Sequence, residues 1–78
     1  MSPTIFQYRN FRFFFFSREE TRIHVHVYTP NGESKYWLEP KVELAVNHGL
    51  KPTELNIALE QIIDHEDEIK AAWKKHFG

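Results

Sequence analysis

The first 40 residues alternate between apolar and polar positions in short runs, as strands do when successive side chains point to opposite faces of a sheet. Four such runs are bounded by turn-forming residues and cover residues 4–8, 11–16, 23–28 and 33–38. A polar loop is expected over residues 17–21, and Pro40 ends the fourth run. The pattern predicts four antiparallel strands in sequence order, a β-meander.

The first two runs are joined by Arg9-Asn10, which suits a two-residue turn. The cross-strand partners expected from that turn are Phe6–Phe13, Tyr8–Phe11 and Ile5–Phe14. Along residues 11–16 phenylalanine occupies both faces of the strand. A strand of this kind is either central and covered on both sides, or it leaves an aromatic patch for a partner.

The third and fourth runs flank Asn31-Gly32, a pair that tolerates the positive φ values of a tight hairpin turn. This turn fixes a register in which Val27 pairs with Tyr36 and Val25 with Leu38 on the apolar face. On the other face the expected partners are Tyr28–Lys35, His26–Trp37 and His24–Glu39.

After residue 40 the apolar spacing becomes helical. Residues 42–46 are compatible with a short helix that ends at His48-Gly49, and Pro52 suits the first turn of the next helix. A helical stripe follows, formed by Leu55, Leu59, Ile62, Ile69, Trp73 and Phe77. One continuous helix over residues 53–77 and two helices bent near Asp64-His65 both fit this stripe.

These elements predict a single α+β domain over residues 1–78. A four-stranded antiparallel β-meander over residues 1–40 is followed by two or three helices in residues 41–78, packed on one sheet face. A chain of 78 residues has room for one core, and its seven Phe, three Tyr and two Trp supply much of that core.

Cysteine is absent from the sequence, which excludes disulfides, thiolate nucleophiles and thiolate metal sites. Small secreted domains usually carry disulfides, so a cytoplasmic location is expected. The first residues lack the basic and apolar segments of a signal peptide. The longest apolar run, Phe13 to Phe16, is far shorter than the roughly 20 residues that span a bilayer, so membrane insertion is not expected.

The net charge of -1 conceals an asymmetry between an arginine-rich first half and an acidic second half. The balance is too mild for a dedicated nucleic-acid-binding domain, although an arginine-bearing sheet face could meet a phosphate. The spacing of Ala45, Gly49 and Leu55 also fits a helix-turn-helix motif. Its second helix would present Glu54 and Glu60 to the groove, so DNA binding is not expected.

His24 and His26 carry the clearest candidate chemistry, because they share one strand face about 6.5–7 Å apart. Histidines can act as a general acid and a general base near neutral pH. The pair could therefore cleave RNA without a metal, with Glu39 orienting His24 and Arg12 or Arg22 stabilising phosphate charge.

Two other readings of this histidine pair remain open. A metal site would need a third ligand from Glu43, His48 or His65, whose positions the sequence does not fix, so no metal or cofactor is predicted. In the structural reading His26 stacks on Trp37 and His24 pairs with Glu39 on a half-exposed face. The binding residues expected there are Arg12, Arg22, Tyr28, Lys35 and Trp37.

Several segments together resemble one bacterial family. They are Phe11-Arg12-Phe13-Phe14-Phe15, His24-Val25-His26-Val27, Lys35-Tyr36-Trp37-Leu38-Glu39-Pro40 and His48-Gly49-Leu50, with Pro3-Thr4-Ile5, Leu44-Ala45, Trp73 and Phe77. The family is catalogued as domain of unknown function 4160. This chain departs from it at Ile23, where the family typically has proline, which affects the loop that enters the histidine strand.

The resemblance implies an α+β fold and a bacterial cytoplasmic protein, with no activity or cofactor attached. Such proteins are often encoded beside another small protein, which suggests a two-component pair of toxin–antitoxin type. Our leading hypothesis is therefore a protein-interaction module that binds a partner chain or forms a homo-oligomer. RNA remains a possible ligand, through the metal-independent ribonuclease reading, and a histidine-based metal-binding protein is the third alternative.

Overall fold

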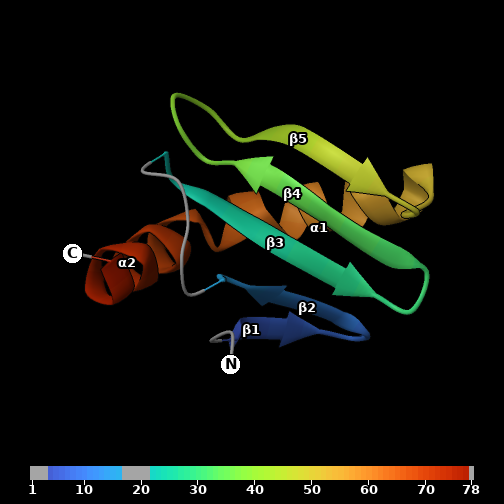
Figure 1. Cartoon of the computed structure of the whole chain (residues 1–78), viewed down its shortest axis with the longest axis horizontal. Coiled ribbons are helices and arrows are strands. Elements are labelled where there is room, and N and C mark those ends of the chain that lie inside the picture. The colour runs from blue at the N-terminus through green and yellow to red at the C-terminus, as the bar shows by residue number, and fades with distance from the viewer. Residues whose placement is uncertain (1–3, 17–21, 78) are drawn as a thin grey trace.

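The computed structural model describes residues 4–16 and 22–77, which form one antiparallel sheet followed by two helices (Figure 1). The strands are β1 (Thr4–Tyr8), β2 (Phe11–Phe14), β3 (His24–Thr29), β4 (Gly32–Trp37) and β5 (Glu43–His48). The helices are α1 (Pro52–Asp64) and α2 (Glu66–Phe77). Each strand pairs with its neighbours in sequence, in the order β1-β2-β3-β4-β5. The α+β class and the meander are confirmed, and the loop expected over residues 17–21 lies outside the described residues.

The strand β5 corrects the prediction of a short helix over residues 42–46. β5 pairs with β4 from Glu33–His48 to Trp37–Glu43. A helix of five residues would leave most of its backbone groups without partners inside the helix. A strand in this place instead satisfies the outer backbone groups of β4. The sheet therefore has five strands rather than four, and it extends into the segment that the sequence pattern assigned to helices.

The first hairpin follows the predicted register over most of its length. Phe6 opposes Phe13 and Tyr8 opposes Phe11, as expected from a turn at residues 9 and 10. A bulge then shifts the pairing, so that Thr4 rather than Ile5 lies opposite Phe14. The predicted Ile5–Phe14 pair is therefore wrong, because one extra residue in β1 cannot be read from the alternation alone.

The second hairpin turns one residue earlier than expected, at Pro30 and Asn31. Proline fixes φ near −65°, which suits the first central position of a common turn. In a turn centred on Asn31-Gly32, Pro30 would instead be the last residue of the strand, where it lacks the N–H that closes the hairpin. The hydroxyl of Thr29 accepts a bond from the Asn31 amide at 3.1 Å and supports this turn. Gly32 becomes the first residue of β4.

This earlier turn moves every cross-strand partner along by two residues. The observed pairs include His24–Trp37, Val25–Tyr36, His26–Lys35, Val27–Ser34 and Tyr28–Glu33. The predicted pairs Tyr28–Lys35, His26–Trp37, His24–Glu39, Val27–Tyr36 and Val25–Leu38 are therefore wrong. Because a shift of two keeps each side chain on its own face, the two predicted faces are nevertheless correct.

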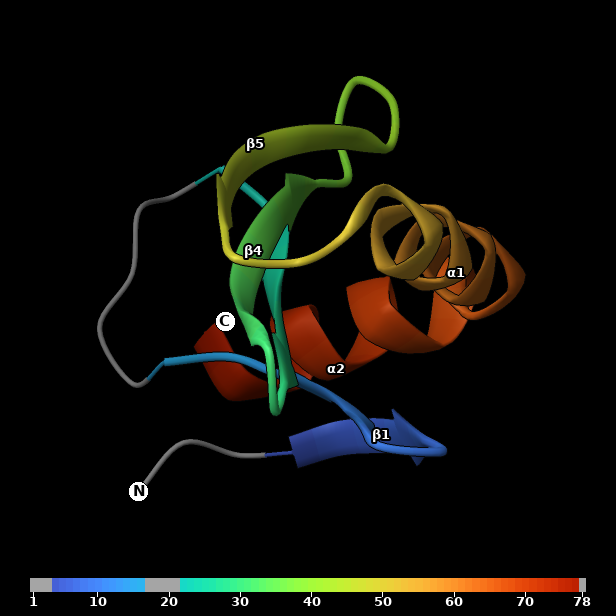
Figure 2. The same ribbon diagram turned by 90° about the vertical axis from the view of Figure 1, so that its right-hand side faces the viewer.

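Both helices lie on one face of the sheet, as Figure 2 shows with the sheet seen nearly edge-on. The core between them combines sheet and helix residues, namely Phe11, Phe13, Phe15, Val25, Val27, Tyr36, Leu38, Leu50, Ala58, Ile62, Ile69 and Trp73. The predicted helical stripe is confirmed, since Leu55, Leu59 and Phe77 also pack against this core. Burial of these aromatic and branched side chains is the main stabilising term for so short a chain.

The helical segment breaks at His65, as the bent alternative predicted. The His65 ring stacks on Phe6 of β1, with ring centroids 4.0 Å apart, and Phe6 in turn stacks on Phe13. The Nδ1–H of His65 donates to the carbonyl of Gln61 at 2.7 Å. These contacts place the junction of α1 and α2 beside the first hairpin.

The start of α1 is tied to the turn between β3 and β4 by Glu54. One oxygen of its carboxylate accepts a bond from the Lys51 amide at 2.8 Å, and the other accepts a bond from the side chain of Asn31 at 2.9 Å. The Lys51 bond, supported by Asn31, lowers the pKa of Glu54 below its usual range. Pro52 occupies the first turn of the helix, as predicted.

Tyr36 links β4 to α1 through a buried hydrogen bond, in which its hydroxyl donates to the Leu55 carbonyl at 2.9 Å. Burial raises the pKa of Tyr36 to about 12. The unfolded tyrosine ionises near pH 10, so the folded state holds this proton more tightly and the resulting stability is lost as the pH rises from about 10 to about 12.

We expect the wild type to lose about 2 to 3 kcal/mol more than a Tyr36→Phe variant over that pH range, at about 1.4 kcal/mol per pKa unit. At neutral pH the variant should be less stable by about 1 kcal/mol, the usual net contribution of one hydrogen bond. Urea unfolding at several pH values measures both effects. Tyr28→Phe, at a tyrosine that is 49% exposed, is the matched control. Parallel alkaline losses in the wild type and Tyr36→Phe would contradict the assignment.

Candidate functional site

The sheet face turned away from the helices carries the residues that the sequence singled out. We call it the open face, and its side chains from β2, β3 and β4 are Arg12, Phe14, His24, His26, Tyr28, Glu33, Lys35 and Trp37. Strand alternation puts them there, because each pairs directly with another member across a neighbouring strand. β5 adds Glu43, Val46 and His48, which oppose Trp37, Lys35 and Glu33.

His24 is fully buried although it belongs to this face. Its Nδ1–H donates to the Arg22 carbonyl at 2.7 Å, and a carbonyl can only accept, so the proton of the neutral ring sits on Nδ1. The indole of Trp73 from α2 lies 5.0 Å from the His24 ring, and Trp37 lies 5.6 Å from it. His24 is thus enclosed by aromatic side chains from both the sheet and a helix.

Glu39 does not face His24, in contrast to the expected register. It follows β4, and its main-chain carbonyl accepts a bond from the Arg22 guanidinium at 3.0 Å. Its carboxylate points to the helical side, where it lies 4.0 Å from the ammonium of Lys70. The structure therefore does not bring together the predicted set of His24, His26 and Glu39.

His26 is buried, and its ring contacts Phe14 of β2 and Phe16, which follows β2. Ring centroids are 5.4 Å from Phe14 and 4.3 Å from Phe16. Its Nδ1 lies 3.7 Å from the carboxylate of Glu33. The two histidine rings are 5.2 Å apart and nearly perpendicular, so the pair does lie together, as predicted from their spacing.

The cationic side chains of the open face, and Arg22 beside it, lie over aromatic rings. Arg12 covers Phe14 at 4.7 Å and donates to the hydroxyl of Thr4 at 2.7 Å. Trp37 has two cations over its ring, the guanidinium of Arg22 at 4.2 Å and the ammonium of Lys35 at 4.5 Å. Such contacts stabilise the side chains by about 0.5–1 kcal/mol each at exposed sites and hold them in fixed positions.

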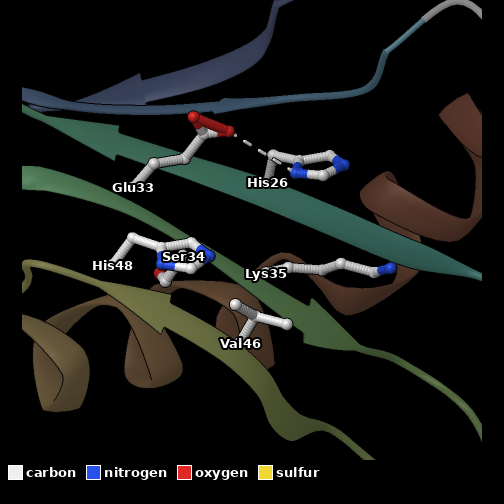
Figure 3. A pocket seen from close by; sticks show the side chains of 6 residues that line it. All are labelled: His26, Glu33, Ser34, Lys35, Val46 and His48. Atoms are coloured by element: carbon white, nitrogen blue, oxygen red, sulfur yellow. Dashed lines mark ion pairs between the residues drawn. The ribbon is translucent and has the colours of Figure 1, made fainter.

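A hollow of about 240 Å³ opens on this face beside β5. Figure 3 shows its side chains, which come from three strands and are His26, Glu33, Ser34, Lys35, Val46 and His48. Glu33, Ser34 and Val46 were not predicted as site residues, and His48 was left unplaced. The two residues of β5 were missed because residues 42–46 were predicted to be helical, and Glu33 because Lys35 was expected opposite Tyr28. The alternation of Val46 and His48 was the signal that could have placed them.

Two observations bear on the predicted acid–base pair and on the metal-site alternative. A general acid and base must reach the substrate, and His24 offers no exposed surface to one. Within residues 4–16 and 22–77, no three histidine, aspartate or glutamate side chains are grouped closely enough to hold a metal ion. What the face presents instead is a fixed layer of aromatic and cationic groups.

A family model described as a domain of unknown function, DUF4160, matches residues 10–74. The chain belongs to the DUF4160 family. The match covers β2 to β5, α1 and most of α2, so it includes the open face of this DUF4160 protein. Searches of curated proteins and of solved structures found no match. No helix in the described part of the chain is long and apolar enough to cross a membrane.

Proposed function

We propose that this DUF4160 protein is a protein-interaction module, one member of a two-component pair of toxin–antitoxin type, and that its open face binds the partner chain. The observation that carries the proposal is the composition of this face. Tyrosine, tryptophan and arginine dominate the binding energy of protein interfaces. The open face combines Tyr28, Trp37 and Arg12, and Arg22 adds its guanidinium over the Trp37 ring. The two-component form of the proposal rests on the family resemblance.

Preorganisation of the face supports this use. Binding is weakened when long side chains must be ordered on contact, at roughly 0.5–1.5 kcal/mol for each one. Arg22 and Lys35 are already held over Trp37, and Arg12 is held over Phe14. The hollow beside β5 adds a concave feature of about 240 Å³, which can accept one large side chain of a partner.

The same face is less suited to RNA. Single-stranded nucleic acids bind by stacking bases on open aromatic rings and by placing phosphates on cations. Here cations already lie over Phe14 and Trp37, and Phe14 is buried. Glu33 and Glu43 add negative charge to the face, which repels a phosphate backbone. A protein partner is therefore the better match.

Affinity capture from a lysate of the encoding organism tests the proposal. We expect a stoichiometric partner, and we expect the double variant Tyr28→Ala/Trp37→Ala to bind it at least about 30-fold more weakly, the effect of losing about 2 kcal/mol at an interface. Ile63→Ala, on the outer surface of α1 where Ile63 is 53% exposed, is the matched control and should bind like the wild type.

The toxin–antitoxin form of the proposal has its own readout. Expression of one member of the pair should inhibit growth, and co-expression of the other should relieve the inhibition. Capture that survives the double variant would show that the open face is not the interface. RNA recovered in place of a protein, and lost in the double variant, would replace this proposal with an RNA-binding one.

A further inference from the structure

The edge strand β5 is the most exposed strand of the sheet. Of its six residues only Ala45 is half-buried, and the others are exposed. The exposed fractions of Leu44 and Val46 are 42% and 40%, which is high for apolar strand residues. The opposite edge differs, because β1 packs Phe6 against His65 and buries part of its length. An edge strand with unpaired backbone groups and exposed apolar side chains is a template for another strand.

A bulge in β5 gives this edge an apolar side chain on each face. Val46 opposes Lys35 and therefore belongs to the open face, whereas Leu44 opposes Tyr36 and belongs to the helix side. In a regular strand the side chains of residues 44 and 46 would point to the same face, and the bulge between them turns them to opposite faces. A strand added along β5 would cover Leu44 on one side and Val46 on the other.

We propose that β5 pairs antiparallel with β5 of a second copy of this chain, across a two-fold axis perpendicular to the sheet. The strand is self-complementary in one register. Glu43 then lies opposite His48 of the second copy, Leu44 opposite Asn47, and Ala45 opposite Val46. By symmetry each of these pairs occurs twice, so a carboxylate–imidazole pair lies at each end of the two paired β5 strands.

The faces of the residues select this register. Glu43 and His48 both belong to the open face, since they oppose Trp37 and Glu33. Leu44 and Asn47 both belong to the helix side, since they oppose Tyr36 and Ser34. A shift by one residue would set Leu44 against Val46 of the second copy, two side chains from opposite faces, and it would separate Glu43 from the imidazole.

The joint sheet would have ten strands, with the helices of both copies on one side. The two open faces would then lie side by side on the other side and could engage a partner at two points at once, which raises its apparent affinity. Six residues in each strand form a small interface, at the low end of the range for specific complexes. The dimer is accordingly weak and concentration-dependent.

Sedimentation of the purified chain from about 10 µM to about 1 mM tests this pairing. The wild-type mass should rise from monomer to dimer over that range. Val46→Lys places a charge on the edge, a substitution that blocks strand addition, and should weaken association at least about 10-fold. Leu44→Lys tests the other face in the same way. Ile63→Lys, at a still more exposed apolar residue on α1, should leave association unchanged.

A charge swap tests the register. Glu43→Lys alone removes the carboxylate from each pair, and His48→Glu alone places two carboxylates opposite each other, so each should weaken the dimer. The double variant Glu43→Lys/His48→Glu sets a lysine opposite a glutamate in each pair and should recover the wild-type mass. Circular dichroism confirms that each variant is folded. A chain that stays monomeric throughout, a dimer that tolerates Val46→Lys, or a double variant that fails to recover would overturn the proposal.

Discussion

Replacing Gly32 by alanine is expected to destabilise this DUF4160 protein by about 3 kcal/mol or more, at the upper end of the cost of overpacking. A Cβ built at Gly32 would lie 2.0 Å from the carbonyl oxygen of His48 and 2.9 Å from the Cα of Gly49. Both are backbone atoms, which cannot move aside as a flexible side chain does. The turn before β4 and the turn after β5 would have to separate.

The turn after β5 cannot easily move away from Gly32. Gly49 has a φ of +103°, a conformation that favours glycine, although it follows a strand and not the helix that was predicted to end there. The side chain of Asn47 clamps the same turn, because its amide donates to the Leu50 carbonyl at 3.1 Å and its oxygen accepts from the Leu50 amide at 3.0 Å. Movement forced by an alanine at position 32 would break these bonds.

Urea unfolding followed by circular dichroism measures the effect of Gly32→Ala. Pro30→Ala is the matched control, because Pro30 belongs to the same turn and is exposed. It should change the free energy of unfolding by no more than about 1 kcal/mol. Equal losses in the two variants would show that the Gly32 contact is not a source of stability.

Trp73→Ala should cost about 3–5 kcal/mol, the range for truncating a large buried aromatic residue. Trp73 is buried, with its ring 5.2 Å from Phe15, 5.0 Å from His24 and 4.3 Å from Phe77. Its removal opens the space between α2 and the sheet. A loss of this size is a large part of the 5–15 kcal/mol that stabilises a typical domain.

A variant of the other tryptophan, Trp37, distinguishes a contribution to stability from a contribution to binding. Trp37 is only half-buried on the open face, so we expect Trp37→Ala to cost about 1–2 kcal/mol and to leave the fold intact. Thermal unfolding of Trp73→Ala, Trp37→Ala and the wild type measures the difference. A Trp37 variant as unstable as the Trp73 variant would mean that the open face is part of the core, and the proposed interface would lose its basis.

The parts of the fold that the sequence predicted depend on local chemistry. Pro52 marked the start of α1, and the apolar stripe from Leu55 to Phe77 marked the buried side of both helices. The fifth strand could not be predicted in this way. The spacing of Leu44 and Val46 fits a short helix as well as a strand, because so few residues are involved. The strand forms because it pairs with the edge of β4, and the local sequence of residues 43–48 does not reveal that pairing.

The site was predicted in part for a similar reason. Alternation correctly placed His24, His26 and Tyr28 on one face with Lys35 and Trp37. It could not reveal that His24 is enclosed, because the enclosing ring belongs to Trp73 on the last helix. Alternation within the four predicted strands also could not predict the hollow, because two of its lining residues, Val46 and His48, belong to β5.

The order of the elements along the chain has a consequence for biosynthesis. All five strands precede the helices, and two of the turns between strands need only two residues each, so the meander can form while the chain is still being made. Its apolar side, with Phe13, Val25 and Val27, packs against residues of α1 and α2 in the core. Residues 49–77, which carry the chain from the end of β5 to the end of α2, take about 2–6 seconds to synthesise at 5–20 residues per second. During that interval the apolar side of the nascent sheet is exposed to aggregation, and it is protected only when α2 packs on it.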